Sequence, residues 1–125
     1  MISLTEASIV SLLMFGLGML LGHRLTLWRD RRQEFNAAAR PIREWLVKVT
    51  LHPDGNWPRP GAGEMYEFTT RLSRRQRRKF IDAVDRHRNA WNEEHVVDDK
   101  GYWSLRNTEP VISAANEALR YTRLR

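Results

Sequence analysis

The chain opens with an apolar run, ISLTEASIVSLLMFGLGMLLG (residues 2–22), in which Glu6 is the only formal charge. A block of arginines follows directly, at Arg24, Arg29, Arg31 and Arg32. As a helix, the run would be about 31 Å long, which matches the hydrocarbon core of a bilayer. The stretch therefore predicts a transmembrane anchor over residues 1–23, with the span at about residues 2–22.

Two alternatives to a retained anchor are a cleaved signal peptide and a buried core helix. A signal peptide has a basic region before its apolar run and a small-residue cleavage site after it. Here the basic residues lie on the other side, and Gly22-His23-Arg24 is a poor cleavage site. A retained anchor is the preferred interpretation.

The distribution of charge predicts the orientation of the anchor. All 21 Lys and Arg residues follow residue 23, and the net charge is +6. Positive residues that flank a span stay on the cytoplasmic side. We expect a single-pass protein of the cell inner (cytoplasmic) membrane, with its N-terminus outside and its C-terminus in the cytoplasm. The lack of cysteine agrees with a reducing compartment.

Residues 24–51 are expected to form a juxtamembrane amphipathic helix that continues from the anchor. Residues at a heptad spacing form a seam that is typical of helix packing, because six of its seven positions are apolar. The seven are Trp28, Arg32, Phe35, Ala39, Ile42, Leu46 and Val49. Pro41 predicts a kink, although it could also begin a second helix. The seam could form a dimeric stalk, but packing on residues 74–93 of the same chain is preferred.

Residues 52–63 are rich in proline and glycine and predict a loop, after which residues 64–125 predict a helical cytoplasmic domain. Ser73 and Gln76 have the spacing of a capping box. Asp98-Asp99-Lys100-Gly101 is a turn signal for a small hairpin. Thr108 or Asn107 would cap a last helix. The expected fold class is all-α, with one N-terminal transmembrane helix continuing into a small cytoplasmic helical domain.

The densest charge cluster predicts a basic surface. Its six residues are Arg71, Arg74, Arg75, Arg77, Arg78 and Lys79. Such a cluster can contact phosphates, but a nucleic-acid reader usually interleaves exposed aromatic residues with its arginines, and here the aromatic residues fall in phase with the core. An acidic protein or anionic lipid is the preferred acceptor. A merely solvated face is the further alternative.

The histidines and glycines give no sign of an enzyme. His87 is in phase with an apolar stripe and is expected to be a hydrogen-bonded core residue; metal binding with His95 is disfavoured by their eight-residue separation. The chain has no phosphate-binding loop, nucleophile elbow or cysteine nucleophile. We expect no catalytic residue, cofactor or metal.

Small residues within the apolar run suggest helix packing in the membrane. Gly18 and Gly22 have the GxxxG spacing, and Ser11 extends the same face. The expected partners are membrane lipid and either a second copy of the chain or another membrane protein.

Several short segments resemble small, uncharacterised single-pass inner-membrane proteins of proteobacteria. These segments are Gly22-His23-Arg24-Leu25, residues 30–36, Pro41-Ile42-Arg43, residues 77–80 and residues 118–122. None of these motifs is catalytic, so the resemblance implies location and fold and assigns no role to any residue.

The expected function is that of a membrane-anchored, non-enzymatic interaction or adaptor protein. Its basic cytoplasmic face would meet an acidic protein partner or anionic lipid. The alternative is a membrane-tethered nucleic-acid-binding protein that uses the Arg71–Lys79 cluster.

Overall fold

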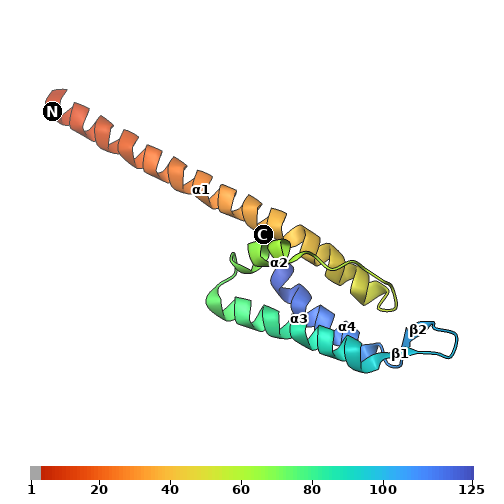
Figure 1. The fold of residues 1–125 in the computed structure, drawn as a ribbon. Coiled ribbons are helices and arrows are strands. Elements are labelled where there is room, and N and C mark those ends of the chain that lie inside the picture. Colours follow the sequence, from red (N-terminus) through yellow and green to blue (C-terminus); the bar gives the residue numbers. More distant parts are fainter. Residues whose placement is uncertain (1–3) are drawn as a thin grey trace. The chain divides into compact units, whose positions relative to one another are not determined.

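The computed structural model describes residues 4–125, so the predicted start of the span at Ile2 lies outside the described residues. The described chain is mostly helical and divides into two compact units, Met1–Glu34 and Phe35–Arg125. Its elements are α1 (Leu4–Leu51), α2 (Ala62–Thr69), α3 (Arg74–Glu94), β1 (His95–Val97), β2 (Trp103–Leu105), α4 (Glu109–Leu119) and a final 3₁₀ turn (Arg120–Thr122) (Figure 1).

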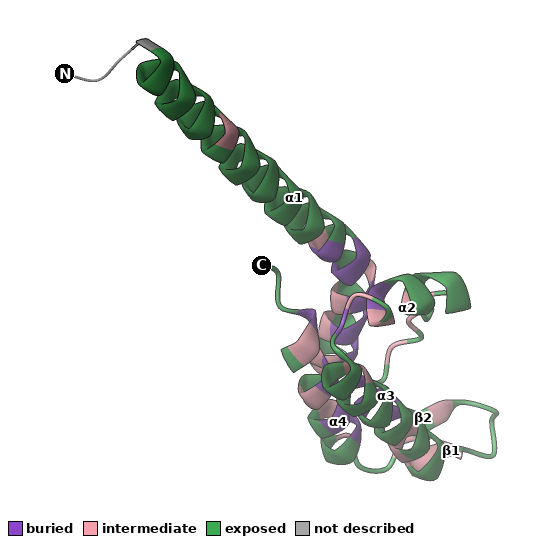
Figure 2. Ribbon diagram, turned by 90° about the vertical axis from the view of Figure 1, so that its left-hand side faces the viewer, coloured by how far each residue is buried: buried purple, intermediate pink, exposed green. Residues whose placement is uncertain are grey.

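The first unit contains the apolar part of α1. An 18-residue window of this helix has a mean hydropathy of 1.6 and no buried residue, so α1 is long and apolar enough to cross a membrane. Its large side chains are exposed, from Ile9 to Leu21, and Figure 2 shows this part of the helix almost entirely in the colour of exposed residues. A large exposed apolar surface of this kind is typical of a site that contacts a membrane or another protein.

The helix remains continuous across Pro41. A proline removes one backbone donor and crowds the preceding turn, but here it does not end the helix. The alternative of a second helix beginning at Pro41 is therefore wrong, whereas the predicted bend stays a prediction.

The second unit has one core, which the last part of α1 shares with α2, α3 and α4. From α1 it buries Phe35, Ala39, Ile42, Leu46 and Val49, together with Phe68, Phe80, Ala83, Val84, Val111 and Ala115 from the other helices. The seam therefore packs within the chain from Phe35 onward, as preferred. The first two positions of the predicted seam are not part of the core. Trp28 is 61% exposed, and the Arg32 guanidinium lies over the Trp28 ring, 5.0 Å from the ring centroid.

The local signals for α3 and the hairpin are confirmed. The Ser73 hydroxyl accepts a hydrogen bond from the Gln76 amide at the start of α3. Strands β1 and β2 pair antiparallel, with Val96 opposite Ser104. The turn between them uses the Asp98 carboxylate as an acceptor for two backbone amides, and Gly101 takes a positive φ of 86° that suits glycine. The hairpin is the departure from the all-α prediction.

The ends of α2 and α4 differ in detail from the predictions. Helix α2 begins at Ala62, two residues inside the predicted loop. At α4, Thr108 occupies the N-cap position without a side-chain bond, and the side chain of Asn107 accepts from the Glu109 amide instead, at 3.1 Å. The buried face of α4 also includes Ala114 and Ala118.

Candidate ligand pocket and basic surface

The loop that follows α1 folds back along the end of that helix. The indole Nε1 of Trp57 donates to the carbonyl oxygen of His52 at 2.8 Å, and the Lys48 ammonium lies over the Trp57 ring, 5.6 Å from its centroid. Gly55 makes this possible, since a Cβ there would lie 2.5 Å from Trp57 Nε1. The loop is thereby held facing α3.

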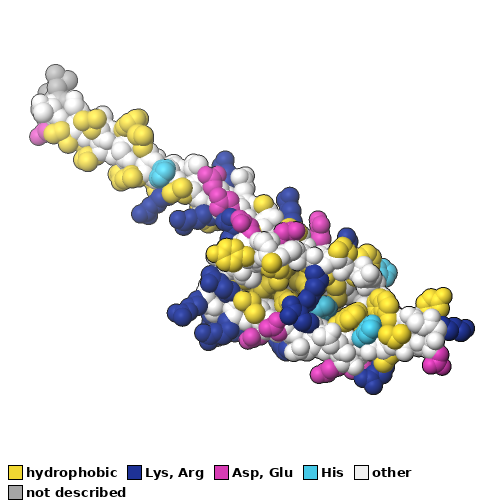
Figure 3. Space-filling model, in the orientation of Figure 1, with side chains coloured by type: hydrophobic (Ala, Val, Ile, Leu, Met, Phe, Trp, Pro, Cys, Tyr) yellow, Lys and Arg dark blue, Asp and Glu magenta, His cyan; other side chains and the backbone are white. Residues whose placement is uncertain are grey.

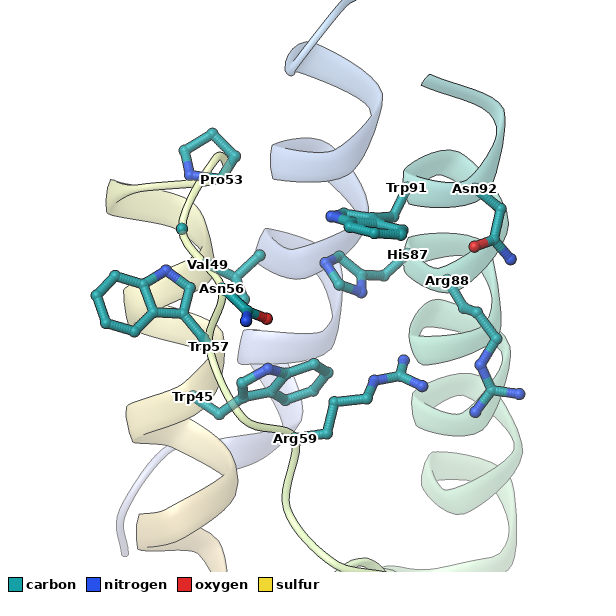
Figure 4. Close-up of a pocket in the computed structure, with 11 residues that line it drawn as sticks. Trp45, Val49, Pro53, Asn56, Trp57, Arg59, His87, Arg88, Trp91 and Asn92 are labelled. Atoms are coloured by element: carbon teal, nitrogen blue, oxygen red, sulfur yellow. The ribbon is translucent and has the colours of Figure 1, made fainter. Parts of the chain in front are cut away.

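A pocket of about 400 Å³ lies between α1, this loop and α3 (Figure 4). The lining residues are mainly aromatic, cationic and amide-bearing: Trp45, Val49, Pro53, Gly55, Asn56, Trp57, Arg59, His87, Arg88, Trp91 and Asn92. None of them is acidic. In Figure 4 the Arg59 side chain extends from the loop toward α3, and the Arg88 side chain comes from α3 and runs along that helix.

Arg59 is held at the edge of the pocket by an aromatic ring. Its guanidinium lies over Trp45, 5.4 Å from the ring centroid, in cation–π geometry. Burial, and then the positive charge of Arg88, lower the pKa of Arg59, while Asp85 acts in the opposite direction. The positive charges of Arg59 and Arg88 are thus close enough to repel each other. An anion bound between them would reduce this repulsion.

His87 is the buried polar residue of the pocket. The ring is 5% exposed and meets the Trp45 ring edge-on, with 5.5 Å between centroids. Among the described residues, neither Nδ1 nor Nε2 has a hydrogen-bond partner. Burial, and then the Arg59 charge, lower the pKa of His87 to about 4. The expected core position is confirmed, but the expected hydrogen bond is not formed with any residue of the described chain.

The predicted basic surface divides into two groups. Arg71 pairs with Glu67 at 2.7 Å, and Arg77 Nε donates to the Thr69 carbonyl oxygen at 2.9 Å. These two hold the α2–α3 connection. The other four, Arg74, Arg75, Arg78 and Lys79, are exposed and form no ion pair within residues 4–125.

These four residues, which we call the α3 patch, lie on one side of the helix because they are three and four positions apart. Figure 3 shows Lys and Arg side chains gathered at this end of α3. The first turn of α3 contains no acidic residue. The positive end of the helix dipole therefore adds to their charge.

The predicted packing face in α1 is open. Ser11 and Gly22 are exposed, and a Cβ at Gly18 or Gly22 would meet nothing within 4 Å. The four flanking arginines, Arg24, Arg29, Arg31 and Arg32, are exposed as well. No contact tests the packing face, so its role stays a prediction.

His95 lies apart from any set of metal ligands in the described chain. Its ring stacks on Trp91 with centroids 4.5 Å apart. Residues 4–125 contain no group of three or more His, Asp or Glu side chains that could hold an ion.

The sequence did not predict the pocket. Trp57 and Arg59 stand in a proline-rich loop whose path no periodic pattern gives, and Trp45 lies beside the heptad seam. The one available signal was Trp57 itself, a large aromatic residue among the prolines and glycines of the loop. No family model matches the chain, and no curated protein or solved structure is significantly similar to it.

Proposed function

We propose that this chain is a membrane-anchored, non-enzymatic interaction protein whose α3 patch binds an acidic protein or anionic lipid. The observation that carries the proposal is the apolar, wholly exposed window of α1 followed by Arg24, Arg29, Arg31 and Arg32. A bilayer would cover the window, and the arginines would remain on the cytoplasmic side. The resemblance to single-pass inner-membrane proteins supports the same location.

The α3 patch supports the interaction role. Its four cations form no ion pair among the described residues, whereas Arg71 of the same cluster is paired with Glu67. Exposed charges of one sign attract a partner of the opposite sign and accelerate its association.

The anchor and its orientation can be tested by cysteine labelling, because the chain contains no cysteine. Thr5→Cys and Ser113→Cys are treated with a membrane-impermeant maleimide in intact spheroplasts. We expect Thr5→Cys to react at once and Ser113→Cys to react only after lysis. Labelling in the reverse order, or recovery of the unlabelled protein in the soluble fraction, would contradict the proposal.

The interaction can be tested by purifying the full-length protein from native membranes in mild detergent, with and without nuclease. We expect an acidic protein or anionic lipid to co-purify and to be lost when Arg74, Arg75, Arg78 and Lys79 are all changed to Gln. A matched control changes four scattered exposed cations, Arg40, Arg86, Lys100 and Arg123, to Gln. Equal loss in both variants would refute a specific patch, and a nuclease-sensitive partner would favour the nucleic-acid alternative.

A further inference from the structure

We propose that the pocket between α1, the 52–61 loop and α3 binds a small organic anion with a flat aromatic body. The anionic group would lie between Arg59 and Arg88, and a polar edge of the ligand would meet His87. This site is separate from the α3 patch, and the inference does not depend on the proposed function.

The charge of the lining specifies an anion. Arg59 and Arg88 both line the pocket, and no acidic side chain does. Asp85 lies close enough to act on Arg59 but is outside the lining. Guanidinium groups match carboxylate and phosphate oxygens through paired hydrogen bonds, so either anion fits.

The apolar lining specifies the body of the ligand. Trp45, Trp57 and Trp91 supply three indole rings, and Figure 4 shows Trp45 and Trp91 on either side of the His87 ring. Aromatic walls favour a flat ring in offset or edge-to-face contact. A volume of about 400 Å³ lies within the range of small-ligand sites.

His87 is the second, independent indication of a ligand. Buried polar groups are nearly always hydrogen-bonded, yet both ring nitrogens of this side chain, which is 95% buried, are unpartnered in the described chain. Its low pKa keeps the ring neutral near pH 7. A neutral imidazole offers one donor and one acceptor. A ligand with a hydroxyl, amide or protonated ring nitrogen beside its aromatic body would pair with one of them.

Asn56 and Asn92 complete the polar lining. In Figure 4 the Asn56 side chain lies on the side of the pocket opposite His87. Its amide can donate and accept, so it extends the polar edge that His87 begins. A few placed polar groups in an aromatic cavity are typical of a specific small-molecule site.

The test is calorimetric titration of the full-length protein in detergent with three matched probes. These are 6-hydroxy-2-naphthoate, 6-hydroxy-2-naphthyl phosphate and the neutral 6-hydroxy-2-naphthamide, each of which carries a hydroxyl that can pair with His87. We expect at least one of the two anions to bind about tenfold or more tightly than the amide, because hydrogen bonds to a charged group are the stronger ones. The preferred anion identifies the ligand as a carboxylate or a phosphate ester.

Three variants locate the binding. Arg59→Gln and Arg88→Gln should each weaken the preferred anion about tenfold and leave the amide unchanged. His87→Phe keeps an aromatic ring but removes both nitrogens, and it should weaken all three probes. Arg75→Gln, which removes an exposed cation of the α3 patch, should leave all affinities unchanged and controls for net charge.

Each remaining outcome overturns the proposal. Equal binding of the amide and both anions would show a hydrophobic surface without charge recognition. No binding at millimolar concentration, with the wild-type protein folded by circular dichroism, would show that the pocket is not a site for this class. Equal weakening by Arg75→Gln and Arg59→Gln would assign the effect to net charge alone.

Discussion

The Trp45 ring meets the His87 ring edge-on, with centroids 5.5 Å apart and an interplanar angle of 86°. This contact joins α1 to α3 at the base of the pocket and excludes water from the imidazole. Because the ring is buried without a hydrogen-bond partner among residues 4–125, the contact favours the neutral form. The stability of this unit is therefore linked to pH.

The first prediction follows from the lowered pKa of His87, about 4 in the folded chain against 6.5 for an exposed histidine. Below pH 6.5 the His87 imidazole takes up a proton in the unfolded chain but stays neutral in the folded chain. The free energy of unfolding therefore falls as the pH falls from 6.5 to about 4. The loss should reach about 3 kcal/mol. Thermal or denaturant unfolding across this range measures it.

His87→Phe should remove this part of the pH dependence, since it has no titrating group. At pH 7 it should be as stable as the wild type or more so, because an unpaired buried polar group is lost. His52→Gln changes an exposed histidine and should keep the wild-type slope. An unchanged slope in His87→Phe would contradict the prediction.

The second prediction concerns Gly55, where a Cβ would lie 2.5 Å from Trp57 Nε1. Gly55→Ala should displace the indole and break its hydrogen bond to the His52 carbonyl oxygen, at a cost of about 1–3 kcal/mol. Gly61→Ala, with nothing within 4 Å of the new Cβ, is the matched control. Unfolding free energies of the two variants check this; equal values would show that the loop adjusts without strain.

The third prediction separates Arg77 from the α3 patch. Arg77→Gln removes the 2.9 Å hydrogen bond to the Thr69 carbonyl oxygen and should cost about 1 kcal/mol of unfolding free energy. Arg74→Gln makes the same charge change at an exposed position and should be near neutral. Equal destabilisation by the two variants would mean that the cluster acts only through its charge.

The fourth prediction concerns Asn36, which exchanges two hydrogen bonds with the backbone of Arg125, at 3.0 and 2.8 Å. The Arg125 guanidinium also lies over Phe35, 4.0 Å from the ring centroid. Asn36→Ala should free residues 123–125 and speed amide hydrogen exchange there, with about 1 kcal/mol of lost stability. Gln33→Ala, at an exposed position on the same helix, should leave this exchange unchanged.

Local sequence signals predicted the elements because each depends on residues near in the chain. Ser73 at a helix start and Gly101 in a turn act within four residues of themselves, and both are found in their predicted places. The prediction that His87 shares an apolar face of its helix was also correct, because it is buried together with Phe80 and Val84 of α3, and the helical period alone decides which positions share a face.

The pocket could not be predicted from these local signals, because its lining residues are distant in sequence and are brought together only by the tertiary fold. Trp45, Arg59 and His87 come from α1, the loop and α3. The fold-back of the loop combines the close approach of Gly55 to the Trp57 ring with the hydrogen bond from Trp57 to the His52 carbonyl oxygen. Likewise, the sequence showed that Arg77 and Arg74 are both basic. Only the structure shows that Arg77 is hydrogen-bonded to the Thr69 carbonyl oxygen and that Arg74 is exposed.

By itself, the sequence determined the long apolar helix, the asymmetry of charge behind it, and the helical periods and turns of the remainder. These properties follow from side-chain chemistry and from spacing along one helix. The tertiary structure alone decided that the seam from Phe35 to Val49 packs within the chain and that two arginines line one aromatic pocket. It also decided that His87 is buried with no hydrogen-bond partner among residues 4–125. Burial and electrostatic environment are set by neighbours distant in sequence, and only packing brings those neighbours together.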